Sequence, residues 1–171
     1  MNRSLAMEPV FLALGQTVYV CQCFEGSIVA LLALFNEEVH GTNDGRAFQA
    51  TIDNVSRKTL GPLLDSARKI VDVAPQVDEL LKEGLELRNR VIHRFADEFA
   101  GKVQSPHGRA EVVAELFRWR LRLIECDDAV HAMLNAILAR RGVSVQDFVR
   151  RADDLWNTLN PSDGQDAPSK H

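Results

Sequence analysis

The sequence predicts an all-α protein, folded as an antiparallel bundle of three long helices and about three short ones. Apolar residues recur at steps of three and four along most of the chain, and no segment alternates apolar and polar residues as a half-buried strand does. The composition, with 46% hydrophobic and 26% charged residues, is typical of a soluble globular domain. The 171 residues therefore predict one helical domain over residues 1–159 and a disordered tail over 160–171.

The first long helix is expected to begin at Pro9, because proline is favoured in a first turn, and to end near His40. Positions 11, 14, 18, 21, 25, 28, 32, 35 and 39 alternate steps of three and four, as in a heptad seam. Glu25 is the one charged residue among them. The pattern therefore assigns a single carboxylate to the core face of this helix.

Two short helices are expected next, one through Phe48, Ile52 and Val55 and one capped by Thr59. The second long helix starts at Pro75, since the residue before a proline is pushed out of helical geometry, and reaches about residue 101. Both short helices should connect the first two long helices of the bundle.

The third long helix is expected to follow the loop at residues 105–108 and to end near Arg140. Gly142 suits the left-handed position that often follows a helix. Ser144 and Asp147 have the spacing of a capping box and predict a last short helix. The seam of the third helix is apolar throughout and consists of Val112, Leu116, Trp119, Leu123, Cys126, Val130, Met133 and Ile137.

The second long helix carries an arginine inside its apolar face. At about 100° per residue, Arg88 falls within the apolar stripe, Asn89 and His93 lie on its flank, and Arg90 and Arg94 point away from the core. A guanidinium among apolar neighbours is unfavourable unless a carboxylate or another anion faces it. This segment is therefore the candidate functional region.

Two interpretations of Arg88 stay open on the pattern alone. Glu25 can pair with Arg88 as a buried ion pair that fixes the register of two helices. Alternatively, Arg88, Asn89 and His93 form a polar pocket that receives an anion from outside, with Glu25 in support. Structural ion pairs and active sites disturb a periodic pattern in the same way.

The segment at residues 87–95 resembles the signature of HEPN domains, which are α-helical bundles. Their long helix carries an arginine, four to six residues and then a histidine, commonly with Asn, Asp or His directly after the arginine. Arg88, Asn89 and His93 fit that form. The resemblance covers the bundle, roughly residues 8–140, and only the motif is specific.

The resemblance implies a metal-independent endoribonuclease of the toxin or defence type, with a composite active site at a homodimer interface. Carried over, Arg88 would hold the scissile phosphate, His93 would act as general acid and base, and Asn89 would help to orient the site. Arg90 and Arg94 lie close to the motif and are the candidate RNA contacts. An antitoxin protein is a possible further partner.

These residue types suit the chemistry. Histidine can take and give a proton near neutral pH, and arginine stays charged and binds phosphate through paired hydrogen bonds. Attack of the RNA 2′-OH on the adjacent phosphate then needs neither metal nor cofactor. One departure concerns a tyrosine that some HEPN toxins carry two residues after the histidine and that a partner enzyme modifies with AMP. That position is Phe95 here, so control by this modification is not expected.

Composition and cysteine usage limit which other classes of protein are compatible with the sequence. A net charge of −4 excludes binding to nucleic acid through overall basicity, although not through a local patch. Cys21, Cys23 and Cys126 have neither disulfide nor zinc spacing and are expected to be reduced thiols. The apolar run from Val10 to Phe24 is shorter than a membrane span and reads poorly as a signal peptide. A cytoplasmic protein without a membrane segment or metal site is therefore expected.

Two other functions remain in competition with the nuclease. One is a non-catalytic HEPN-like bundle that binds RNA, a nucleotide or a partner protein, and the other is a plain helical scaffold. His93 discriminates best between them, because a scaffold has no need of an imidazole at that position.

Overall fold

The computed structural model describes residues 3–40, 75–144, 146–147 and 150, with side chains of the first helix described for residues 6–34. Within these ranges all regular structure is helical and no strand is present, which confirms the all-α class. The short helices expected between residues 45 and 74, most of the last helix and the tail lie outside the described residues. The described structure forms two units, residues 1–134 and residues 135–171, which are considered separately.

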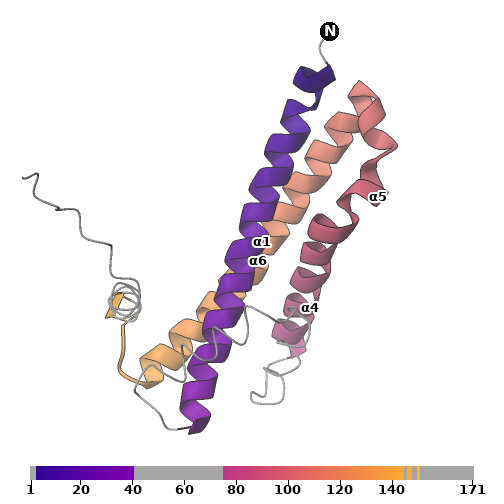
Figure 1. Cartoon of the computed structure of the whole chain (residues 1–171). Helices are drawn as coiled ribbons and strands as arrows, with labels where there is room; N and C mark the ends of the chain where they lie inside the picture. Colours follow the sequence, from indigo (N-terminus) through magenta and orange to yellow (C-terminus); the bar gives the residue numbers. More distant parts are fainter. Residues whose placement is uncertain (1–2, 41–74, 145, 148–149, 151–171) are drawn as a thin grey trace, which may run out of the picture. The chain divides into compact units, whose positions relative to one another are not determined.

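Helix α1 spans Arg3–His40, so the start expected at Pro9 is wrong by six residues (Figure 1). Pro9 lies inside the helix, in its second turn, where it lacks the N–H that would bond to the preceding turn. The helix therefore tolerates one missing backbone hydrogen bond close to its end. Proline marks a helix start only as a preference, and here the six preceding residues are compatible with helix as well.

The buried face of α1 differs from the seam that the sequence predicted. Val10, Thr17, Cys21, Phe24 and Ile28 are the buried residues along its first part, whereas Phe11, placed in the seam, is 59% exposed. The run from residue 10 to residue 24 is apolar on nearly every face, so spacing alone did not select the side that packs.

The stretch Ala6–Leu34 of α1 is long and apolar enough to cross a membrane by length and composition. It is the one such stretch among the residues that the structure describes. The core helix of a soluble protein meets the same criteria, and 44% of the most apolar window is buried within the protein.

The second long helical segment is not one α-helix. It consists of α4 (Pro75–Asn89), the π-helical segment η1 (Arg90–Arg94) and α5 (Phe95–Phe99), followed by the short 3-10 turn η2 (Lys102–Gln104). The continuous α-helix expected from residue 75 to 101 is therefore interrupted in the middle of the motif. A π turn accommodates one more residue than an α turn, and hydrophobic spacing does not reveal it.

Helix α6 spans Pro106–Arg140, close to the expected bounds, and its start is fixed by a local cap. Ser105 Oγ accepts a hydrogen bond of 3.0 Å from the backbone N–H of Gly108. Position 108 must be glycine-sized, because a Cβ there would lie 2.0 Å from the carbonyl oxygen of Lys102. The seam expected on α6 is confirmed, with all its members buried except the half-buried Met133.

Three helices of the first unit, α1, α4 and α6, meet at Gly84. A Cβ at this position would lie 2.7 Å from Cζ of Phe24 on α1 and 3.0 Å from Cβ of Cys126 on α6. One turn earlier, the thiol of Cys126 donates to the carbonyl oxygen of Leu80, with a separation of 3.3 Å. Helix α4 runs antiparallel to both of its neighbours (Figure 1). The absent side chain thus sets how closely α4 approaches α1 and α6.

Exposed apolar side chains gather on α1 and α6. They include Phe11 (59%), Leu12 (62%) and Tyr19 (67%) on α1 and Phe117 (49%) on α6. A shallow groove beside them is bordered by residues of α1 and by Arg120 of α6, whose guanidinium lies 5.2 Å from the Phe117 ring centroid. Of the large exposed hydrophobics that the structure describes, only Ile92 belongs to the motif-bearing segment.

The described part of the second unit confirms two local predictions. Gly142 has a positive φ of 65°, and the hydrogen bonds from Gly142 N–H to Ala139 O and from Val143 N–H to Leu138 O form a Schellman motif. Ser144 Oγ accepts a 3.0 Å hydrogen bond from the backbone N–H of Asp147, as a capping residue does.

Candidate functional site

The π-helical segment brings the two ends of the motif together. Arg88 lies in the last turn of α4, and His93 lies in η1. In an α-helix two residues five apart differ by about 140° around the axis, as the sequence analysis assumed. In a π-helix the hydrogen bonds join residues five apart, so such residues are neighbours on one face. The observed separation of Arg88 Nη1 and His93 Nε2 is 3.0 Å.

Arg88 is the centre of a small polar cluster that we call the Arg88 cluster, formed with Glu25, Asn89 and His93. Its Nε donates to Oε1 of Glu25 on α1, and the two groups form an ion pair. Its Nη1 donates to Oδ1 of Asn89 over 3.1 Å and faces His93 Nε2. The Arg88 side chain keeps 18% of its surface exposed, and that of Glu25 keeps 31%. Arg88 is therefore paired, as the register interpretation requires, and also joined to the polar pair that the pocket interpretation requires.

The contact between Arg88 and His93 favours one tautomer of the imidazole. A guanidinium has only donors, so Nε2 of His93 must accept the hydrogen bond with its lone pair. An accepting Nε2 corresponds to the imidazole tautomer that carries its proton on Nδ1. Because His93 is exposed, this ring can be reached by a molecule in solution.

The Arg88 cluster can bind an anion and move a proton. Among the residues that the structure describes, the contacts of Arg88 involve Nε and Nη1, and 18% of its side chain is exposed. An oxyanion placed beside this guanidinium would receive charge-assisted hydrogen bonds. In the imidazole beside it, Nε2 can accept a proton and Nδ1 can donate a hydrogen bond. The cluster therefore combines an anion-binding cation with a proton carrier.

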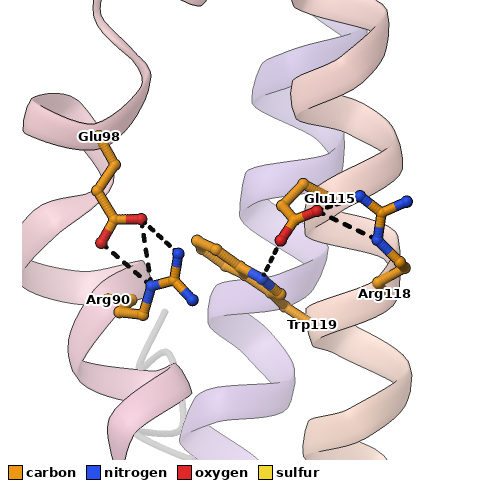
Figure 2. A network of polar contacts seen from close by, with 5 residues as sticks. All are labelled: Arg90, Glu98, Glu115, Arg118 and Trp119. Carbon is orange, nitrogen blue, oxygen red and sulfur yellow. Dashed lines mark hydrogen bonds and ion pairs between the residues drawn. The ribbon is translucent and has the colours of Figure 1, made fainter.

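Arg90 lies in a different environment from the one that the wheel predicted. Instead of pointing away from the core, its guanidinium lies over the ring of Trp119 on α6, 4.3 Å from the centroid (Figure 2). Its Nε and Nη2 both donate to the carboxylate of Glu98, and the closest contact is 2.7 Å. The indole N–H of Trp119 donates to Glu115 over 2.8 Å, and Glu115 also pairs with Arg118. We call Arg90, Glu98, Trp119, Glu115 and Arg118 the Arg90 clamp.

Charge pairing in the Arg90 clamp shifts the pKa of its acidic groups. The hydrogen bond from Arg90 lowers the pKa of Glu98 below its ordinary 4.5. The hydrogen bond from Arg118 does the same for the pKa of Glu115. Reciprocally, Glu98 raises the pKa of Arg90. These groups are therefore ionised at neutral pH, and Arg90 is committed to contacts within the protein.

The remaining predicted residues are placed as follows. Arg94 is exposed, and its charge helps to lower the pKa of Glu98. Cys21 and Cys126 are buried, and burial raises the pKa of the first to about 12 and of the second to about 11, which makes both thiols unreactive. Among the described residues, no three His, Cys, Asp or Glu side chains are grouped so that they could hold a metal ion.

Sequence reasoning missed Glu98. Its distance of eight residues from Arg90 does not correspond to any pair of neighbours in a regular α-helix, where neighbours are three or four apart. The basic and aromatic run at residues 118–122 did draw attention to Trp119. It was assigned to the core, and this is confirmed by its 4% exposure.

No protein-family model, no curated protein and no solved structure matches this chain. The assignment of a function therefore depends on the motif and on the geometry of the two clusters. The Arg88 cluster and the Arg90 clamp are both built from the segment α4 to α5 and from the helices that this segment contacts.

Proposed function

We propose that this protein is a metal-independent endoribonuclease of the HEPN toxin or defence type. The observation that carries the proposal is the 3.0 Å contact between Arg88 Nη1 and His93 Nε2, which unites a phosphate-binding cation and a proton carrier in one exposed cluster. The motif alone is short, and the geometry adds that its two side chains converge across a π turn. The proposed substrate class is RNA.

The proposed reaction is attack of a ribose 2′-OH on the adjacent phosphorus. A neutral histidine accepts the 2′-OH proton while the new O–P bond forms. The bond from phosphorus to the 5′-oxygen breaks, and a protonated histidine gives a proton to that oxygen. The products are a 2′,3′-cyclic phosphate and a 5′-OH end, and DNA is not cut because it lacks the 2′-OH.

Arg88 holds the phosphate and stabilises the charge that develops on its oxygens. Glu25 fixes Nε of the guanidinium, and Asn89 accepts from Nη1, so the plane of the group is held from two sides. A bound phosphate oxygen replaces His93 as the partner of Nη1. Nε2 of His93 is then released for the 2′-OH.

The proposal includes a homodimer in the cytoplasm. Each chain contributes one His93, so two copies facing one cleft supply a base and an acid for the same phosphate. An antitoxin protein is a partner of the same proposal. Arg94, exposed beside the motif, is the favoured RNA contact, whereas Arg90 is engaged in the clamp.

The experiment is RNA cleavage by purified protein with and without EDTA, followed by identification of the ends. We expect cleavage that EDTA does not inhibit and that His93→Ala abolishes. His131→Ala is the matched control, because His131 is also an exposed helical histidine, 55% exposed, and lies on α6. Equal cleavage by wild type and His93→Ala, or no cleavage by folded wild type, contradicts the proposal.

One observation favours the second candidate, a non-catalytic HEPN-like bundle that binds RNA, a nucleotide or a partner protein. The ion pair between Arg88 and Glu25 already neutralises the guanidinium within one chain. In that case RNA binds without being cut, and His93→Ala leaves binding unchanged. An electrophoretic shift with intact RNA, run beside the cleavage assay, separates the two functions.

A further inference from the structure

The π segment η1 changes which side chains share a face of the helix. Adding one residue to a helical turn rotates everything after it by about 100° relative to a regular α-helix. Arg94, the last residue of η1, departs from α geometry, with a φ of −118° and a ψ of −3°. A side chain before η1 therefore shares a face with a side chain after it when their spacing is one residue longer than in a regular α-helix.

Two pairs of side chains depend on that extra residue. The Arg88 and His93 pair has a spacing of five, which corresponds to four in a regular α-helix. The Arg90 and Glu98 pair has a spacing of eight, which corresponds to seven, or two full turns. In a continuous α-helix neither pair would lie on one face, because each would be separated by about 80° or more. At the spacings of the wild-type sequence, both contacts therefore depend on the π turn.

The second pair is also anchored from outside the segment. Arg90 stacks on Trp119, which is buried and is held in its orientation by the hydrogen bond to Glu115. Trp119 in turn contacts Phe99 at the end of α5, with ring centroids 5.5 Å apart. Arg90 thus ties the start of η1 to the Trp119 ring of α6 (Figure 2), and Phe99 ties the far end of α5 to the same ring.

We propose that the Arg90 clamp is a positioning device: by holding η1 as a π turn against Trp119, Arg90 and Glu98 keep His93 in contact with Arg88. Arg90 is a positioning residue, since it touches neither Arg88 nor His93 in the contacts described. As a role in catalysis this rests on the proposed function, whereas the effect on His93 itself does not. Arginine is required because lysine offers no planar group that both stacks and bonds a carboxylate twice.

A deletion tests whether the turn is a π turn. Removal of Ile92, which is 39% exposed, should convert residues 88–99 to regular α-helix and leave every later residue on its present face. We expect this variant to keep a cooperative transition with a Tm close to that of wild type. Removal of Ile124, equally apolar and 40% exposed but in regular α6, should rotate the rest of that helix and abolish cooperative folding. Equal loss of stability in the two deletions overturns the proposal.

A second experiment tests the clamp, with the ¹⁵N and ¹H resonances of the His93 ring as readout. In wild type we expect Nε2 to be the unprotonated nitrogen, because it accepts from Arg88. We expect Arg90→Ala and Arg90→Lys to shift the ring to a mixture of tautomers, because His93 no longer stays beside Arg88. Arg94→Ala, a matched neighbour without these contacts, should leave the ring unchanged. An unchanged His93 ring in Arg90→Ala overturns the proposal.

Combining the two changes distinguishes positioning from general stabilisation. Without Ile92 the pair at 88 and 93 has a spacing of four and needs no π turn, so the deletion should restore the wild-type His93 signature in Arg90→Ala. Loss of the signature in the combined variant overturns the positioning role. If RNA is never cut although His93 responds as expected, the ribonuclease proposal fails and the positioning device stands.

Discussion

Arg88 and Arg90 are two residues apart and have different surroundings. Arg90 makes a double hydrogen bond to Glu98 and stacks on a buried indole, so its charge and its flat face are both engaged. Arg88 shares its guanidinium among one carboxylate, one amide and one imidazole, and the imidazole is exposed. Similar chemistry thus produces a closed structural contact at one position and an open polar cluster at the other.

The difference teaches which arginine is available for a ligand. A basic residue near a motif is an attractive candidate for RNA contact, and both Arg90 and Arg94 were predicted as such. The clamp engages Arg90 because α6 supplies the ring and α5 supplies the carboxylate. Proximity to a motif in sequence therefore says less about ligand contact than the contacts of the group itself.

The largest expected effect comes from the ring on which Arg90 rests. Trp119→Ala removes a buried aromatic side chain together with its contacts to Arg90 and Phe99, and we expect a loss of about 3–5 kcal/mol in the free energy of unfolding. Urea denaturation followed by circular dichroism measures it. Phe117→Ala is the control, because Phe117 is aromatic, lies on the same helix and is 49% exposed. A similar loss in both variants would show that Trp119 is not the anchor.

The next effect tests the approach of α4 to α1, which places Glu25 beside Arg88. Gly84→Ala introduces a Cβ 2.7 Å from Phe24, and we expect a loss of about 1–3 kcal/mol in unfolding free energy. Gly26→Ala should instead stabilise by up to about 1 kcal/mol, because nothing lies within 4 Å of that position and alanine favours helix. The opposite signs are checked by thermal unfolding. Stabilisation by Gly84→Ala is the contradicting result.

A smaller effect separates the two arginines directly. Arg90→Ala should lower the unfolding free energy by about 1–2 kcal/mol, through loss of the paired hydrogen bonds and the stacking. Arg88→Ala should lower it by less than about 1 kcal/mol, because Glu25 is 31% exposed and can be hydrated when unpaired. Denaturant titration of both variants gives the order. The reverse order would mean that Arg88, not Arg90, is the structural contact.

The smallest effect is a dependence of stability on pH. The pKa values of Glu98 and Glu115 are lower in the folded protein than the ordinary 4.5. Their contribution is therefore present above 4.5 and is lost as pH falls through the folded pKa values. Because these groups are partly exposed, we expect a loss of about 1 kcal/mol or less from each, and a shallower decline in Arg90→Ala. Identical pH profiles of unfolding for wild type and Arg90→Ala would contradict the pairing.

The regular parts of this fold could be predicted from the sequence. The seam of α6 is apolar at every expected position and has polar residues around it, so its buried face follows from spacing. The seam of α1 was wrong near Phe11 because the helix there is apolar on several faces. Only contacts with α4 and α6 select the side that packs, and spacing within one helix carries no such information.

The membership of the Arg88 cluster could also be predicted, but its geometry could not. Arg88 was expected either to pair with Glu25 or to form a pocket with Asn89 and His93, since a charge in an apolar stripe needs a partner. Regular α spacing placed His93 about 140° from Arg88 and separated Arg90 from Glu98, so neither the direct Arg88–His93 contact nor the role of Glu98 was predicted. A π turn leaves no mark in the hydrophobic pattern when the residue that it adds, such as Ile92, is itself apolar.

The contact of Arg88 with His93 is tested most directly by the tautomer of the imidazole. Long-range ¹H–¹⁵N NMR of the wild-type protein in mildly alkaline buffer reports which ring nitrogen carries the proton. Our account gives Nδ1 as the protonated nitrogen in wild type, since Nε2 accepts from the guanidinium, and a change in the ring signals in Arg88→Ala. A proton on Nε2 in wild type, with the same spectrum in Arg88→Ala, would contradict the account.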